Sequence, residues 1–62
     1  MNKLHIHCDT IPQFKALREI QRAFIPECII KLELITDGIR ITDITGAQAD
    51  FICDTAGNVS CI

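Results

Sequence analysis

The chain contains no tryptophan or tyrosine, only three phenylalanines, three glycines and two prolines among its 62 residues. It therefore has few aromatic rings on which nucleic-acid bases could stack. No apolar run approaches the roughly 20 residues of a membrane-spanning helix, and the first residues lack the apolar stretch of a secretion signal. We expect a cytoplasmic protein in which the four cysteines remain reduced.

Charge of either sign is also scarce, since six basic and eight acidic side chains give a net charge of −2. A value this small does not by itself indicate a nucleic-acid or membrane partner. Residues 1–32 carry five basic and three acidic side chains, whereas residues 33–62 carry one basic and five acidic ones. Hydrophobic residues make up 48% of the chain, which argues against disorder. We expect residues 1–62 to form one small domain.

The amino-terminal half predicts a strand followed by a helix. Apolar and polar residues alternate over residues 3–8, as in a half-buried strand. Thr10 as N-cap and Gln13 as its capping-box partner predict a helix that ends near residues 24–25, before Pro26. The residues expected on its apolar face are Phe14, Ala16, Leu17, Ile20, Ala23 and Phe24.

The carboxy-terminal half predicts a meander of strands. Residues 28–35 and 39–44 are prone to β-structure and flank Asp37-Gly38, a strong hairpin signal. A two-residue turn there would place Leu34 opposite Ile41. The core face would then hold Ile30, Leu32, Leu34, Ile39 and Ile41, and the other face Ile29, Lys31, Glu33, Ile35, Arg40, Thr42 and Ile44. Asp43 would fall on the core face at the strand end, which predicts a bulge or fraying there.

Two further strands, over residues 49–53 and 59–62, follow turns at residues 45–47 and 56–58. The predicted fold class is α+β, with one amphipathic helix packed on a mostly antiparallel sheet. Its element order is strand, helix, then three or four strands. The helical crossover is long enough for the first two strands to lie parallel, in the right-handed sense.

Two histidines give the most suggestive pattern for a metal or thiol site. His5 and His7 are two apart on the first strand, so both side chains point to one face and could share a metal. Cys8 falls on the opposite face, and no Cys-x-x-Cys pair is present. We therefore expect no metal or other cofactor, and read these as exposed histidines on an edge strand.

Cys53 and Cys61 would lie directly opposite each other if residues 56–58 formed a three-residue loop. They would then either form a disulfide or remain as two reduced thiols among apolar neighbours. No paired-carboxylate motif, glycine-rich phosphate loop or activated nucleophile is present. The sequence therefore predicts a protein without catalytic activity.

Lys15, Arg18 and Arg22 recur at helical spacing on the face of the helix that points away from the core. Such a stripe can meet the phosphates of a nucleic acid, which makes a nucleic-acid-binding or regulatory module one hypothesis. Glu19 interrupts the stripe, and no aromatic residue is interleaved with it. A solvated helix face is the simpler interpretation.

Apolar residues on the sheet face away from the helix favour a different function. Ile29, Ile35 and Ile44 share that face with Arg40, and one helix can cover only one side of a sheet. Their burial would require a second copy of the chain or another protein. Our leading hypothesis is a small protein-binding module, similar in size and style to inhibitor or accessory proteins of phages and mobile elements. It would bind through the spare sheet face, an exposed strand edge or the charged helix face, and the residues expected to take part are these four together with Lys15, Arg18 and Arg22.

Overall fold

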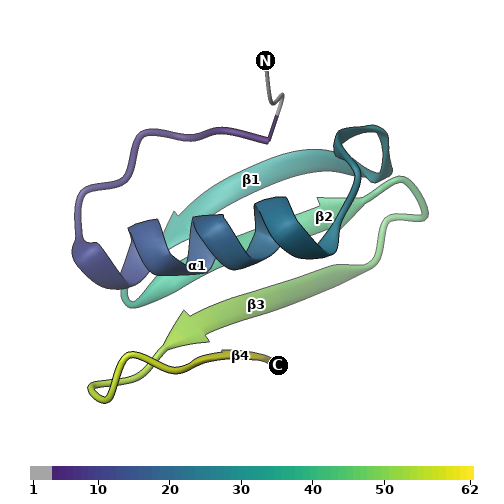
Figure 1. Cartoon of the computed structure of the whole chain (residues 1–62). Coiled ribbons are helices and arrows are strands. Elements are labelled where there is room, and N and C mark those ends of the chain that lie inside the picture. The colour runs from purple at the N-terminus through teal and green to yellow at the C-terminus, as the bar shows by residue number, and fades with distance from the viewer. Residues whose placement is uncertain (1–3) are drawn as a thin grey trace.

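A computed structural model describes residues 4–62 of the chain as one helix packed on one face of a four-stranded antiparallel sheet (Figure 1). The predicted α+β class is confirmed. The strands form a meander in the order β1-β2-β3-β4. The elements are α1 (Ile11–Ala23), a 3-10 turn η1 (Pro26–Cys28), β1 (Ile29–Ile35), β2 (Gly38–Asp43), β3 (Gln48–Cys53) and β4 (Val59–Cys61). Within the described residues, no helix has both the length and the apolar character needed to cross a membrane.

The helix begins as the sequence predicts. The Thr10 side chain accepts a hydrogen bond from the Gln13 backbone N–H, and the Gln13 side chain accepts one from the Thr10 N–H, which completes a capping box. Pro12 occupies the first turn, where backbone N–H groups lack intrahelical acceptors. At the other end, Phe24 leaves the helical conformation. Pro26 follows two residues later and prevents a further helical turn, because the residue before a proline disfavours the α conformation.

The buried stripe of α1 differs from the predicted one at three positions. Ala16, Leu17 and Ile20 are buried as expected, but the fourth buried residue of the helix is polar, Gln13. The Phe14 side chain is 53% exposed, because each residue advances about 100° around the helix and position 14 is therefore past the stripe. Ala23 is also exposed, on the other flank of the stripe.

The core lies between α1 and the sheet, with the helix placed mainly over β2 and β3 (Figure 1). Phe24 and Phe51 meet edge to face, with ring centroids 5.8 Å apart and planes at 82°. The fully buried side chains Ile20 and Ile39 connect the two layers. The core cluster consists of Leu4, Ala16, Leu17, Ile20, Ile39, Ile41 and Phe51.

The predicted first strand is wrong in the part of the chain that the structure describes. Residues 4–8 are extended, with Leu4 in the core and His5 and His7 exposed, so the predicted alternation of faces is present. They form no ladder with β1, however, and Lys3 lies outside the described residues. The Leu4 carbonyl oxygen instead accepts a hydrogen bond of 2.7 Å from Gln21 Nε2 of the helix. The segment therefore packs beside α1 and closes the side of the core next to β1 (Figure 1).

The first hairpin turns one residue earlier than predicted. Thr36 and Asp37 form the loop, and Gly38 pairs with Ile35 as the first residue of β2. Leu34 consequently pairs with Ile39 and not with Ile41. The pairing register of β1 and β2 is therefore shifted by two residues from the predicted one. This shift leaves each side chain on its predicted face, because side chains alternate with a period of two.

A bulge at Ile30 changes the faces at the start of β1. Ile29 pairs with Asp43 and Lys31 with Thr42, which leaves Ile30 as an extra residue on β1. Ile29 therefore packs against the core, and Ile30 is 65% exposed, the reverse of the predicted assignment. The predicted irregularity near Asp43 is thus present, but it lies on the strand opposite that residue.

The second and third turns have the same construction. In each, an aspartate carboxylate accepts backbone N–H groups two and four residues ahead: Asp43 from Thr45 and Ala47, and Asp54 from Ala56 and Asn58. Gly46 and Gly57 hold the same place in the two loops, each with a φ of +88°. A left-handed residue at the end of a three-residue loop closes a hairpin with little strain only if it is glycine.

The register of the last hairpin also differs from the predicted one. The final loop consists of residues 55–57, because the Asp54 N–H donates to the Asn58 carbonyl oxygen at 2.9 Å. Cys53 therefore pairs with Val59, and Cys61 pairs with Phe51. The two cysteines are not opposite each other, and both are free thiols.

Candidate protein-binding surface

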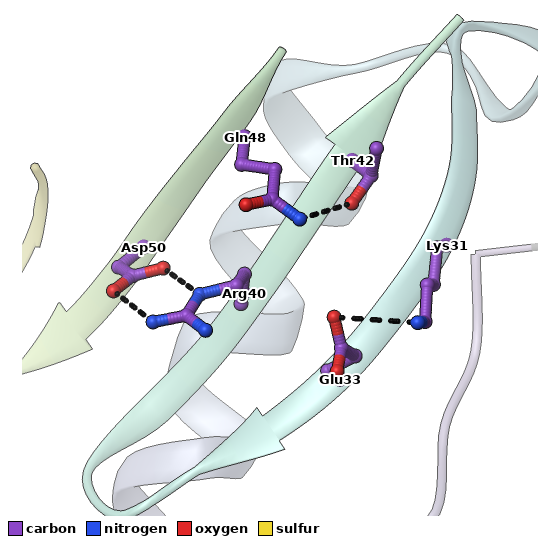
Figure 2. A network of polar contacts seen from close by, with 6 residues as sticks. All are labelled: Lys31, Glu33, Arg40, Thr42, Gln48 and Asp50. Atoms are coloured by element: carbon purple, nitrogen blue, oxygen red, sulfur yellow. Dashed lines mark hydrogen bonds and ion pairs between the residues drawn. The ribbon is translucent and has the colours of Figure 1, made fainter. Parts of the chain in front are cut away.

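The face of the sheet away from α1 is covered by polar contacts between strands (Figure 2). Arg40 binds Asp50 with two hydrogen bonds, Nε to Oδ1 at 2.8 Å and an amino group to Oδ2 at 3.1 Å. Next to this pair, Gln48 Nε2 donates to Thr42 Oγ1 at 3.3 Å. This face is polar at its centre and is not the spare apolar surface that the sequence predicts.

The two-point contact between Arg40 and Asp50 also sets their protonation. The hydrogen bond from the guanidinium group, reinforced by its positive charge, lowers the pKa of Asp50 against a smaller opposing effect of burial. The same contact raises the pKa of Arg40, with a further contribution from the carboxylate of Glu33 on β1. Arg40, predicted as a partner-binding residue, is therefore already bound within the domain.

The three isoleucines predicted to form a partner surface do not lie together. Ile29 packs against the core because of the bulge, and Ile35 is half-buried at the end of β1 beside the first turn. Ile44 is 63% exposed, but it lies in the turn after β2, at the opposite end of the sheet. Of the predicted set, only Ile44 presents a large exposed apolar side chain.

The structure instead exposes the outer edge of β1. This seven-residue strand pairs with β2 on one side, and no other strand of residues 4–62 pairs with it on the other. Ile35 and Gly38 flank a two-residue loop, so they form a hydrogen-bonded pair, and Glu33 and Lys31 follow at steps of two. The backbone N–H and C=O groups of Leu32 and Leu34 therefore point away from β2, toward the open edge.

Charged side chains alternate with apolar ones along this edge. Lys31 and Glu33 lie on the outer face, with Nζ and Oε1 3.7 Å apart and side-chain exposures of 62% and 40% (Figure 2). An ion pair this exposed contributes little to stability and leaves both groups free to reach another partner. Beside them, the bulge directs the exposed Ile30 side chain away from the core.

The extended residues 4–8 run beside the open edge and leave a groove on each flank. In both views the segment lies on the side of β1 away from β2 (Figures 1 and 2). One groove, of about 340 Å³, separates Leu4, His5 and Ile6 from η1 and β1. The other, of about 380 Å³, lies between the segment and the flank of α1 that carries the exposed Phe14. An extended peptide entering the first groove would have β1 on one side and this segment on the other.

Among residues 4–62, no three His, Cys, Asp or Glu side chains gather as a group able to hold a metal ion. His5 and His7 are exposed, and Cys8 is half-buried with its thiol 3.5 Å from the Ile6 carbonyl oxygen. Burial, and secondarily the carboxylate of Asp9, raises the pKa of Cys8. A raised pKa leaves little thiolate at neutral pH, so this cysteine is a poor nucleophile.

The basic residues of the helix do share one surface. Lys15, Arg18 and Arg22 line a groove of about 280 Å³ against Gly57 and the start of β4. Arg22 is partly neutralised, since its guanidinium group lies 3.1 Å from the Glu19 carboxylate in an exposed i,i+3 pair. The sequence thus identified the basic stripe correctly as a group, with the acidic interruption in the expected place.

The sequence indicates an exposed strand edge as one possible binding surface, but it does not identify β1 as the strand that forms it. The pattern of residues 3–8 predicts a strand that would cover β1, and only the three-dimensional course of that segment shows the edge to be open. Comparisons with protein-family models, curated proteins and solved structures found no match to this chain.

Proposed function

We propose that this chain is a small non-enzymatic module that binds another polypeptide by strand addition at the open edge of β1. The observation that carries the proposal is that, among residues 4–62, a seven-residue strand is paired on one side only and borders a groove of about 340 Å³ on the other. An added strand gains its affinity from main-chain hydrogen bonds and its specificity from alternating side chains. β1 offers groups for both.

The backbone groups of Leu32 and Leu34 would pair with those of the bound strand. Side chains of that strand on the outer face would meet Lys31 and Glu33, and those on the inner face would enter the groove beside Leu4. β4 is the other sheet edge but has only three residues, too few for a ladder of comparable length.

The chemistry of the thiols supports a binding role in the cytoplasm. All four cysteines, Cys8, Cys28, Cys53 and Cys61, are free, as expected where thiols are kept reduced. Cys8 is the one that adjoins a histidine, and its raised pKa disfavours the thiolate that nucleophilic catalysis requires. The free thiols and the raised pKa of Cys8 are properties of this chain alone and hold whichever polypeptide it binds.

A single backbone change tests the proposal. The chain of 62 residues is within reach of chemical synthesis, so the N–H of Leu32 can be replaced by N-methyl without altering any side chain. The matched control carries N-methyl at Cys61, whose N–H points outward from β4 because Ile62 and Asp50 form the hydrogen-bonded pair there.

Each synthetic protein is immobilised and incubated with a nuclease-treated lysate of the source cells. The proposal expects a stoichiometric protein that is captured by the unmodified chain and by the Cys61 control, and is lost with N-methyl Leu32. A captured set that is the same for all three proteins would overturn it.

The shared groove of Lys15, Arg18 and Arg22 favours nucleic-acid binding as a second candidate function. Phosphate contacts would make that affinity fall steeply with salt. Gel shifts at low salt with mixed DNA and RNA, comparing the natural chain with K15E/R18E, provide the test. A shift that is absent, or that the double substitution leaves unchanged, would exclude this function.

A further inference from the structure

We infer that the strand added to β1 is β1 of a second copy of the chain, in an antiparallel pairing with Leu32 on a two-fold axis. In this register Lys31 lies opposite Glu33 of the other copy, and the backbone of Leu34 lies opposite the bulge at Ile30. The inference rests on the proposed function, because it names the occupant of the open edge. It predicts a dimer whose sheet continues across both copies.

Symmetry restricts the possible registers. Two β1 edges can face each other across a two-fold axis only if that axis is perpendicular to the sheet, which places both helices on the same side. Residues directly opposite each other then share a face of the sheet. One residue of β1 must therefore lie opposite its own copy across the axis, and a register centred between two successive residues is excluded. Leu32 is the central candidate, with Lys31 and Glu33 as the alternatives on either side.

Charge selects among these registers. An axis at Lys31 would place two ammonium groups opposite each other, and an axis at Glu33 would do the same with two carboxylates. Like charges directly opposite on neighbouring strands are destabilising. The axis at Leu32 instead creates two reciprocal pairs, each joining Lys31 of one copy to Glu33 of the other. Both side chains are partly exposed and within 3.7 Å of each other in the single chain, so they already point to the same face.

In this register Ile30 lies at the end of the paired region. Its side chain is 65% exposed, because the bulge turns it from the core of its own copy. Because Ile30 lies on the outer face and Leu34 packs against the core, the two side chains do not meet, and Ile30 lies on the same face as the reciprocal pairs of Lys31 and Glu33. The backbone groups of Leu32 and Leu34 that point away from β2 obtain partners in the same step.

The groove beside residues 4–6 is where the second strand enters. The extended segment flanks the open edge, with Leu4 held in the core and its carbonyl oxygen bonded to Gln21 of the helix. In the dimer, one such segment lies on each side of the axis, next to the paired β1 strands. The bulge at Ile30 ends the regular part of each strand and keeps the ladder short. The assembly closes at two copies because the two-fold pairing uses the β1 edge of both.

Charge exchange provides a decisive test, with the association constant of the full chain measured by analytical ultracentrifugation. We expect a dimer for the natural chain. K31E and E33K should each weaken it on the order of tenfold, because each places like charges in both reciprocal pairs. K31E/E33K should restore it, because the exchange recreates both opposite-charge pairs. An equimolar mixture of K31E and E33K should form a heterodimer tighter than either variant with itself.

E19K is the matched control, since it makes the same change of charge as E33K but on the helix, away from β1, and should leave the association constant unchanged. Thermal unfolding of each variant at low concentration separates weakened association from loss of fold. A natural chain that is monomeric at millimolar concentration, or a double variant as weak as the single ones, would overturn the inference.

The two proposals fail in different ways. A monomeric natural chain whose captured protein is lost with N-methyl Leu32 would reject self-pairing and retain strand addition by another polypeptide. A monomeric chain whose captured set ignores N-methyl Leu32 would reject both.

Discussion

Gln13 donates a hydrogen bond of 2.7 Å from its side-chain Nε2 to the carbonyl oxygen of Ile35, and thereby joins the start of α1 to the end of β1. The other end of the same amide accepts from the backbone N–H groups of Asp9 and Thr10. With 6% of its surface exposed, it is the buried polar residue of the described core. One side chain therefore caps the helix and fixes its position over the sheet.

Gln13→Leu should destabilise the domain by about 1–3 kcal/mol, because it removes the partners of partly buried donors and an acceptor at both ends of the amide. Gln21→Leu is the matched control. It removes a bond of equal length to the Leu4 carbonyl oxygen at the rim of the core, and should cost less. Urea unfolding followed by circular dichroism measures both. A Gln13 variant as stable as the Gln21 variant would contradict this account.

Gly38 is predicted to tolerate no larger residue. A Cβ atom there would lie 1.8 Å from the Phe51 carbonyl oxygen, which belongs to the backbone of β3 and cannot move aside. G38A should cost more than about 3 kcal/mol, a large part of the stability of a domain this small. G46A provides the comparison: its site is open but has a φ of +88°, so strain of only about 1 kcal/mol is expected.

If thermal unfolding shows G46A to be the less stable of the two variants, then backbone strain and not close packing limits these glycines. Equal melting temperatures for G38A and the natural chain would mean that β2 and β3 lie farther apart than the structure has them.

Local signals in the sequence were sufficient for the helix and for a meander of three or four strands after it. The capping box of Thr10 and Gln13 and the stop at Pro26 act within one or two turns of chain, so they can be read from neighbouring residues. Gly38 was misread for a physical reason. Next to an aspartate it resembles a turn glycine, but what requires glycine there is the approach of β3, which is remote in sequence.

The candidate site depends even more on long-range contacts. The alternation of Lys31 and Glu33 is visible in the sequence. The placement of a charged residue, Asp43, on the predicted core face correctly indicated an irregularity nearby. Whether β1 has an open edge depends on the course of residues 4–8. Their alternating pattern is satisfied equally by a strand and by an extended segment that packs Leu4 into the core. Periodicity alone could not distinguish these arrangements.

The Arg40–Asp50 contact should make stability depend on pH in the acidic range. Because the folded-state pKa of Asp50 is lowered, its contribution is fully present above the unfolded pKa of about 3.9 and is lost as pH falls through the folded pKa. Asp50→Asn should therefore be less stable than the natural chain at pH 7, with a difference that shrinks below about pH 4. Urea midpoints from pH 7 to pH 2 measure it.

Arg40→Gln removes the same contact from the other strand and serves as the control for that measurement. It should reproduce the pH profile of Asp50→Asn, and the double variant should lose no more than either single one. A difference between natural and variant chains that persists unchanged to pH 2 would show that the contact does not set the pKa of Asp50.

The register of β4 can be tested through its cysteines. Cys53 pairs with Val59, and the flanking pairs of Asp54 with Asn58 and Asp50 with Ile62 are the hydrogen-bonded ones. Residues 53 and 59 therefore form a non-hydrogen-bonded pair, in which side chains approach most closely. V59C should give a disulfide between positions 53 and 59 under mild oxidation, detected by mass spectrometry of proteolytic fragments. The natural chain should yield no Cys53–Cys61 disulfide under the same conditions, because its register places Cys61 beside Phe51. If oxidation instead links Cys53 to Cys61 in the folded natural chain, β4 is displaced by two residues and the edge that it forms must be reassigned.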